Sequence, residues 1–212
     1  VPRTLEEFII RICKRRLSIG ADGLILIESS KKAHYKITYY NCDGSFANLC
    51  LNGTRCAARF AFIKVIAPKE HKIETDAGVF GAEVLGKNVK LSFPSTKVKI
   101  NELEIKGYKG YLVDAGVPHL IIPMEENLYK VDFLKIAKNL RWAEELKPEG
   151  ANVCFVAILE PNVIFMRTYE RGIEDEVLSC SSGAWAAICV LNYANFTIEN
   201  KIEVANLSGI PL

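Results

Sequence analysis

The sequence has few residues of the kinds that build metal centres. It holds three histidines, at widely separated positions, and none of its seven cysteines forms a Cys-x-x-Cys pair. Structural zinc sites use closely spaced cysteine and histidine ligands, so the spacing argues against such a site. No lysine stands in a recognisable phosphate-cradling context, which argues against pyridoxal phosphate. We therefore expect neither a metal nor an organic cofactor.

Long hydrophobic runs and strong net charge are also absent. No segment approaches the ~18 to 20 apolar residues of a membrane span, and the formal net charge is only +2. The longest basic cluster, Lys14-Arg15-Arg16, falls in a predicted amphipathic helix and is best explained as a solvated face. We expect no membrane and no nucleic-acid partner. Seven cysteines without an opening signal peptide favour the reducing cytoplasm over a disulfide framework.

Two short segments in different halves of the chain share one pattern, Cys-x-x-Gly. They are Cys50-Leu51-Asn52-Gly53 and Cys180-Ser181-Ser182-Gly183, and each precedes an Ala-rich apolar run without Pro that favours a helix, residues 57–66 and 184–191. Each cysteine is therefore predicted just before a helix N-terminus. Backbone N–H groups and the helix dipole there stabilise a thiolate, or hold a substrate carboxylate.

Two such cysteines facing one site would take a proton from one side of a carbon and return one from the other side. The remaining five have no helix-entry context and are predicted to be small buried hydrophobic residues: Cys13, Cys42, Cys56, Cys154 and Cys189.

The rest of the chain alternates short strands with a few helices. Hydrophobic periodicity and capping residues predict helices over 4–17 and 131–140. Alternating and β-branched segments between turn residues predict strands over 24–28, 35–41, 72–75, 79–85, 89–93, 112–114, 120–123, 152–159, 163–169 and 201–204.

The order of elements repeats, which predicts an α+β protein of two pseudo-symmetric halves. Each half is expected to be an antiparallel-rich sheet or barrel wrapped on a central helix, with the active site in the cleft between them. We place the halves at residues 1–95 and 96–212, with the boundary at Pro94-Ser95. The strand 72–75 continues into a hairpin, whereas its echo 201–204 lies near the last residue. We expect the natural protein to supply first strands and a last strand beyond these ends.

Seven segments together resemble the diaminopimelate epimerase family, cofactor-independent two-cysteine amino-acid epimerases. They occur in the family's order over nearly the whole chain: Gly20-Ala21-Asp22-Gly23-Leu24, Tyr40-Asn41-Cys42-Asp43-Gly44-Ser45, residues 50–56, Gly116-Val117-Pro118-His119, Asn152-Val153-Cys154-Phe155-Val156, Arg167-Thr168-Tyr169-Glu170-Arg171-Gly172 and residues 180–184.

The resemblance implies an isomerase that interconverts LL- and meso-diaminopimelate on the route to lysine and cell-wall peptide. It makes Cys50 and Cys180 the catalytic acid and base, with no cofactor. It also implies a small-molecule amino-acid substrate and leaves a homodimer open. The positions that match substrate-binding residues are Asn41, Asn152, Glu170 and Arg171 for the distal end, and the backbone at Leu51, Asn52, Ser181 and Ser182 for the reacting carboxylate.

Three positions depart from the family pattern. Leu51 and Ser181 stand where the family usually has Gly after each catalytic cysteine, and Val117 stands where some members have Asn. A leucine after Cys50 is expected to narrow the pocket or to cost rate. Two alternatives therefore stay open: a related racemase or epimerase of another amino acid, and a non-catalytic amino-acid-binding protein. The second would need the helix ends but neither thiol.

Overall fold

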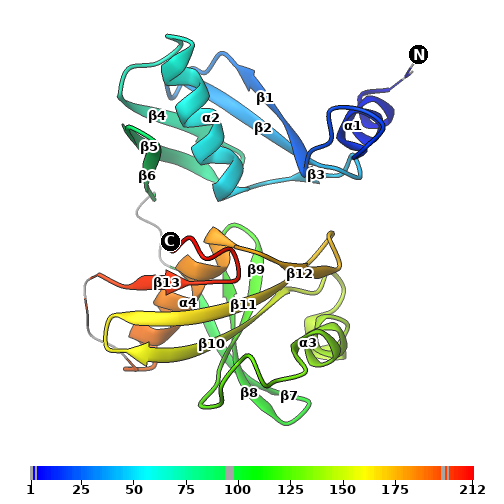
Figure 1. Cartoon of the computed structure of the whole chain (residues 1–212), viewed down its shortest axis with the longest axis vertical. Helices are drawn as coiled ribbons and strands as arrows, with labels where there is room; N and C mark the ends of the chain where they lie inside the picture. Colours follow the sequence, from blue (N-terminus) through cyan, green and yellow to red (C-terminus); the bar gives the residue numbers. More distant parts are fainter. Residues whose placement is uncertain (1, 3, 94–97, 197–198, 200) are drawn as a thin grey trace. The chain divides into compact units, whose positions relative to one another are not determined.

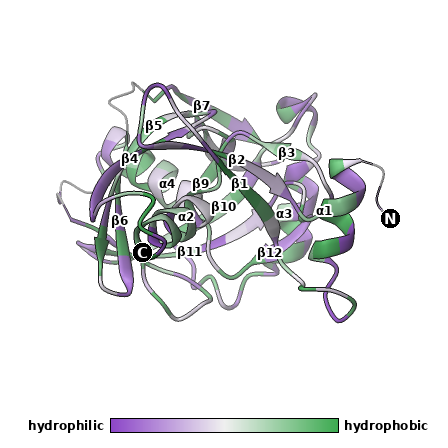
Figure 2. Ribbon diagram, turned by 90° about the horizontal axis from the view of Figure 1, so that it is seen from above, coloured by the Kyte–Doolittle hydropathy of each residue, from purple (hydrophilic) through white to green (hydrophobic). Residues whose placement is uncertain are grey.

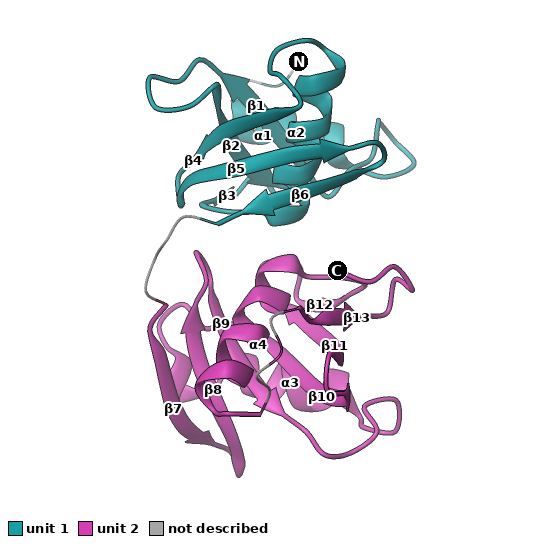
Figure 3. Ribbon diagram, turned by 90° about the vertical axis from the view of Figure 1, so that its left-hand side faces the viewer, with its two compact units in different colours: residues 1–96 teal, residues 97–212 magenta. Residues whose placement is uncertain are grey.

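A computed structural model shows a chain divided into two compact units, Val1–Thr96 and Lys97–Leu212 (Figure 3). It describes residues 2, 4–93, 98–196, 199 and 201–212. The boundary expected at Pro94-Ser95 lies outside the described residues. Within the described part, no helix is long and apolar enough to cross a membrane.

Unit 1 is one mixed sheet with a helix packed on it (Figure 1). The strand order is β1-β2-β4-β5-β6, with β3 paired to β2, and all pairs are antiparallel except β2 with β4. The elements are α1 (Leu5–Cys13), β1 (Gly23–Glu28), β2 (Tyr35–Asn41), β3 (Phe46–Ala47), α2 (Leu51–Ile63), β4 (Glu70–Thr75), β5 (Gly78–Leu85) and β6 (Asn88–Ser92).

The core of unit 1 lies between α2 and one face of this sheet. Small residues of α2 (Ala57, Ala58, Ala61) let the helix approach the strands closely. They pack against Ile37 and Ile73 from the central strands. The helix α1 has hydrophobic and hydrophilic sides (Figure 2), and its Thr4 cap accepts a hydrogen bond from the N–H of Glu7 at 3.1 Å.

Unit 2 is a larger mixed sheet of order β12-β11-β10-β9-β8-β7, with β13 paired to β11. Two pairs are parallel, β9 with β10 and β11 with β13. The elements are β7 (Ile100–Ile105), β8 (Tyr108–Asp114), β9 (Pro118–Pro123), α3 (Phe133–Arg141), η1 (Glu144–Leu146), β10 (Asn152–Glu160), β11 (Val163–Glu170), β12 (Asp175–Val177), α4 (Ser181–Tyr193) and β13 (Glu203–Ala205).

The central strands of unit 2 are buried on both faces. Successive side chains of a strand point to opposite faces, and on β10 Val153 and Phe155 pack with α3, whereas Cys154 and Val156 pack with α4. Such strands are nearly continuous apolar runs, because neither face meets water. The helix α4 is thereby held in a dry setting, with Ala186 and Ala187 fully buried.

The two units contain the same sub-structure. In each, a hairpin (β1·β2, β10·β11) is followed by a short antiparallel strand (β3, β12), a helix of 13 residues (α2, α4) and a strand parallel to the second hairpin strand (β4, β13). Both helices also end alike, with Val65 and Asn195 at φ 58° and the next N–H bonded back at 2.8 Å to Ala61 and Leu191. The predicted pseudo-symmetry within an α+β fold is confirmed.

Predicted elements differ from the observed ones mainly at their ends. The first helix ends at Cys13 rather than at 17, because Arg16 takes φ 66° and the N–H of Gly20 returns to the carbonyl of Ile12. The helix predicted over 57–66 begins directly after Cys50. The predictions missed β3, β7, β12 and the short η1 helix.

Candidate active site

Cys50 and Cys180 are the N-caps of α2 and α4, as the Cys-x-x-Gly pattern predicted. Their backbones have nearly the same angles, φ −135° and ψ 103° for Cys50, φ −129° and ψ 106° for Cys180. Each sulfur accepts the N–H of the glycine three residues on, Gly53 or Gly183, at 3.4 Å. This N–H bond and the helix dipole both favour negative charge on sulfur.

The two glycines are needed for space rather than for an unusual φ. A Cβ atom on Gly183 would lie 3.0 Å from Sγ of Cys154 and 3.3 Å from Sγ of Cys180. A Cβ atom on Gly53 would lie 3.2 Å from Ile25 and 3.3 Å from the ring of Tyr39. In both units, Gly lets the amide that bonds the sulfur sit tightly against the sheet.

His119 is the centre of a buried polar cluster beside Cys180. Its Nδ1 lies 2.8 Å from the carbonyl oxygen of Val117, an acceptor only, so Nδ1 carries the proton and Nε2 is an acceptor. Toward Nε2 point the side-chain amide of Asn152 at 3.1 Å, the hydroxyl of Ser182 at 3.2 Å and the Cys180 sulfur at 3.8 Å. Ser182 Oγ also lies 3.4 Å from this sulfur.

Burial keeps this cluster neutral. His119 is 0% exposed, and desolvation lowers its pKa to about 4, against the smaller raising effect of its bond to the Val117 carbonyl. Desolvation also raises the pKa of Cys154 well above its usual value, and the charge of a Cys180 thiolate adds to this. The thiol of Cys154 therefore stays protonated.

Asn152 and Arg171 are joined directly. The Asn152 Oδ1 atom accepts the backbone N–H of Arg171 at 2.7 Å, which turns its NH₂ group toward His119. The guanidinium of Arg171 lies 3.2 Å from a carboxylate oxygen of Glu149. The side chain of Asn152 is thus engaged within unit 2, and its contact with a substrate stays a prediction.

Asn41 and Glu170 occupy equivalent places. Each ends the second hairpin strand of its unit and precedes a turn. In unit 1 the N–H of Asn41 donates to the Ser45 carbonyl at 2.9 Å, and in unit 2 the Glu170 carbonyl accepts the N–H of Glu174 at 2.8 Å. The Asn41 side chain donates to the Ser45 hydroxyl at 3.0 Å. The repeat thus places one predicted distal-end residue at the end of the second hairpin strand in both units.

The expectation that Leu51 narrows the pocket is wrong. Its side chain is 2% exposed and packs in a cluster of unit 1 with Leu49 and Phe80, so it serves the core. Ser181 and Ser182 are each 8% exposed, while the side chain of Asn52 accepts a bond from Arg55 at 2.7 Å. Backbone amides of these first-turn residues point along the helix axis, away from the helix body.

The prediction for the other cysteines is only partly right. Cys13 and Cys154 are buried and Cys189 is half-buried, but Cys42 and Cys56 are exposed. Cys56 lies on the exposed face of α2. The apolar residues next to it in the sequence, which suggested burial, lie on the opposite face of the helix. The described residues include all seven cysteines, and none forms a disulfide. Among the described residues, no three His, Cys, Asp or Glu side chains lie together in a way that could hold a metal ion.

Several residues that contact the candidate site had no clear signal in the sequence. His119 appeared only as the end of the Gly116–His119 motif, and Arg141, Glu149 and Glu174 were not singled out at all. Their partners are distant in sequence, Arg141 bonding Glu174 and His119 approaching Asn152 across 33 positions each. Only the motif position of His119 gave a local signal.

The fold and the paired cysteine caps define the class of protein. The chain is similar to a hydroxyproline epimerase from Agrobacterium vitis with bound trans-4-hydroxy-L-proline, with a TM-score of 0.74 at 13% identity, over 99% of this chain and 72% of that one. It is also similar to a Bacillus anthracis phenazine biosynthesis protein of the PhzF family, with a TM-score of 0.70 at 14% identity, over 97% and 77%. The chain thus has the two-domain fold of the proline racemase and PhzF type.

Closer relatives narrow the class to one family. The family model for diaminopimelate epimerase matches residues 2–100. A diaminopimelate epimerase of Hydrogenobaculum sp. (strain Y04AAS1) is 38% identical over 97% of this chain and 77% of the relative, and that of Aquifex aeolicus (strain VF5) is 38% identical over 96% and 75%. The chain belongs to the diaminopimelate epimerase family.

Proposed function

We propose that this protein is an isomerase that interconverts LL- and meso-diaminopimelate, in the formation of lysine and peptidoglycan precursors. The observation that carries the proposal is the pair Cys50 and Cys180, which cap equivalent helices with the same geometry in a member of this family. A carboxylate needs only the helix ends, so two retained thiols favour proton transfer over simple binding.

The reaction moves one proton at an α-carbon. The thiolate of one cysteine removes it, and the thiol of the other delivers a proton to the opposite face, which inverts the centre. An amino-acid α-proton is too weakly acidic for a free thiolate, so charge spreading into the carboxylate must be stabilised. First-turn amides at Leu51-Asn52 and Ser181-Ser182 would supply this as preorganised donors, and the positioned acid and base add general acid–base catalysis.

The distal end of the substrate carries a second carboxylate and ammonium. We assign the carboxylate to the guanidinium of Arg171, which can bind it bidentately, and the ammonium to Glu170, with Asn41 and Asn152 in support. The 2.7 Å hydrogen bond from the Arg171 backbone N–H to Asn152 supports this assignment, because it fixes the backbone position from which the arginine side chain extends. A thiolate and a thiol must both stay reduced, so the proposal includes a reducing compartment, the cytoplasm.

Proton NMR in heavy water tests the proposal. The protein is incubated with LL-diaminopimelate, and we expect loss of the α-proton signal together with formation of the meso isomer. Histidine, proline and other monocarboxylic amino acids are run in parallel. Exchange on one of these and none on diaminopimelate would identify a racemase of another amino acid. Saturable binding of an amino acid without exchange would identify a binding protein.

A further inference from the structure

Arg141, the last residue of α3, is a buried cation outside the predicted site residues. Its side chain is 6% exposed, and its guanidinium stacks 4.2 Å over the Trp142 ring. It donates to Glu174 Oε1 from Nε at 3.2 Å and from Nη2 at 3.0 Å, and to the Glu149 carbonyl from Nη1 at 3.2 Å. A Cβ atom on Gly150 would lie only 1.8 Å from Nη1, so the glycine leaves the space that the arginine fills.

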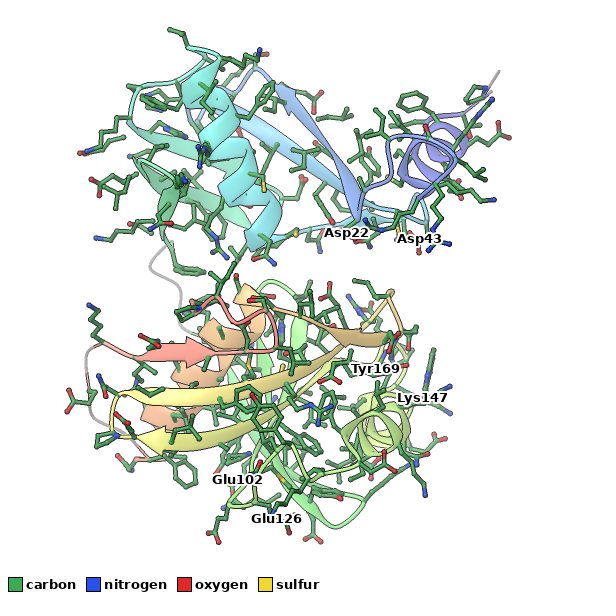
Figure 4. The ribbon with its side chains drawn as sticks, in the orientation of Figure 1. Asp22, Asp43, Glu102, Glu126, Lys147 and Tyr169 are labelled. Carbon is green, nitrogen blue, oxygen red and sulfur yellow. The ribbon has the colours of Figure 1, made fainter. Side chains whose placement is uncertain are left out.

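Glu174, its partner, closes the turn that carries Glu170 and Arg171. Glu174 takes φ 56°, and its N–H donates to the Glu170 carbonyl at 2.8 Å. Its carboxylate accepts the N–H of Gly172 at 3.1 Å as well as Arg141. Its carbonyl oxygen accepts a hydrogen bond from the hydroxyl of Tyr169, labelled in Figure 4, at 2.7 Å. Bonds to several groups therefore hold this one residue, and with it the turn.

Arg141 also touches the other segment beside Arg171. The residue whose carbonyl it binds, Glu149, pairs through its carboxylate with the Arg171 guanidinium. The end of α3 thus fixes the loop at 149–150 and the turn at 170–174 together. Both segments flank the group assigned to the distal carboxylate.

On the basis of the proposed function, we infer that Arg141 and Glu174 are positioning residues that set specificity for the distal amino-acid end of the substrate. They hold the Glu170-Arg171 turn in one conformation before binding. A turn that is already ordered loses less conformational entropy when the ligand binds, so the fixed turn raises affinity for ligands that reach it. A ligand that does not reach the turn gains nothing from it.

Another arginine–glutamate pair of unit 2, Arg167 and Glu176, serves as a matched comparison. Arg167 and Glu176 are 14% and 12% exposed and bond at 2.6 Å. Arg167 also donates to the Leu128 carbonyl at 2.8 Å. This pair fixes β12, the strand that leads toward Cys180. Its loss is expected to act on the rate of proton transfer for every substrate.

The test compares Arg141→Met and Glu174→Gln with the wild type and with Arg167→Met. Calorimetry measures the Kd for diaminopimelate, and α-proton exchange measures KM and kcat for it and for 2-aminoheptanoate, which lacks the distal carboxylate and ammonium. We expect Kd and KM for diaminopimelate to rise about 10-fold in the first two variants, with kcat and all values for 2-aminoheptanoate within about 2-fold. Arg167→Met should lower kcat for both substrates.

Tyr169→Phe is a milder variant that keeps the test informative if Arg141→Met or Glu174→Gln does not fold. It removes only the hydroxyl that donates to the Glu174 carbonyl. We expect a KM rise of about 3-fold for diaminopimelate and a melting temperature lowered by only a few degrees. Equal losses on both substrates, or Kd values for diaminopimelate equal to that of the wild type, would overturn the inference. A wild type that binds diaminopimelate without exchange would instead overturn the proposed function, while the Kd comparison still decides this inference.

Discussion

The sulfur of Cys180 lies 3.8 Å from Nε2 of His119, the side of the ring without a proton. A neutral histidine in this tautomer accepts a hydrogen bond and cannot donate one to a thiolate. It therefore gives a Cys180 thiolate no hydrogen bond, whereas the Gly183 N–H does. The two contacts differ in the way that suits the proposed role of Cys180, which is to take a proton in one direction of the reaction and to give one in the other.

The burial of neutral His119 makes folding stability depend on pH. Its folded pKa, about 4, is lower than the ordinary 6.5, so the unfolded chain binds the proton more tightly. The contribution of His119 to the free energy of unfolding is complete above pH 6.5. It is lost as the pH falls toward 4, and the loss reaches ~2 kcal/mol by pH 4.5. Urea unfolding of the wild type and His119→Gln at pH 7.5 and 4.5 measures it. We expect the free energy of unfolding to drop less in the variant than in the wild type. Some drop should remain, because His71 also has a lowered pKa. Equal drops would contradict the assignment.

Local patterns predicted the helix entries but not the network around them. Cys-x-x-Gly followed by alanines predicted both caps because a cap depends on neighbouring residues. Val65 takes φ 58° although a β-branched residue disfavours it, so the end of α2 could not be predicted from sequence. The strand β12 has three residues, and one of them, Glu176, is held by a hydrogen bond from Arg167. Such elements depend on tertiary contacts.

Residues near the site show the same limit. The position of Leu51 after Cys50 suggested a wall of the pocket, but α2 begins at Leu51 and turns its side chain into the core with Phe80. The two-fold repeat was visible in the order of elements. The links between Asn152, His119 and Cys180 were not, because they come from β10, β9 and the start of α4, which lie far apart in the chain.

Cys50 and Cys180 should both be required for turnover. In Cys50→Ser and Cys180→Ser the hydroxyl can cap the helix but is a far poorer base at neutral pH, so kcat should fall by about 10²-fold or more. Exchange of the α-proton in heavy water measures this, and unchanged melting temperatures would show that the caps survive. Cys56→Ser, an exposed cysteine on α2, is the control and should keep wild-type activity. Full activity in either catalytic variant would exclude the two-thiol mechanism.

Leu51 should matter for stability and little for substrate choice. Leu51→Ala removes a side chain that is 2% exposed, and we expect a loss of about 2 to 4 kcal/mol in the free energy of unfolding. KM for diaminopimelate should stay within about 2-fold at 25 °C, since the side chain packs in the core with Leu49 and Phe80. Leu49→Ala, in the same cluster, should behave alike. A large change in KM for Leu51→Ala alone would return Leu51 to the pocket wall.

Arg171 and Glu149 should have opposite effects on substrate preference. The two side chains are paired at 3.2 Å, with Arg171 28% and Glu149 76% exposed, so a substrate carboxylate must compete with Glu149 for the guanidinium. Arg171→Ala should lower kcat/KM for diaminopimelate by about 100-fold, because one set of charged hydrogen bonds worth ~3 kcal/mol is lost. Its kcat/KM for 2-aminoheptanoate should change little.

Glu149→Gln should do the reverse by releasing the guanidinium for the substrate. Exposed pairs are weak and screened by salt, so KM for diaminopimelate should fall only about 2-fold at low ionic strength, and less at 0.5 M salt. Steady-state kinetics with diaminopimelate and 2-aminoheptanoate in competition measure both variants, and Lys147→Gln, which breaks the exposed Lys147–Glu144 pair nearby, is the charge control. If Glu149→Gln raised KM instead, Glu149 would itself bind the substrate, through the distal ammonium, and the carboxylate would not compete with it for Arg171.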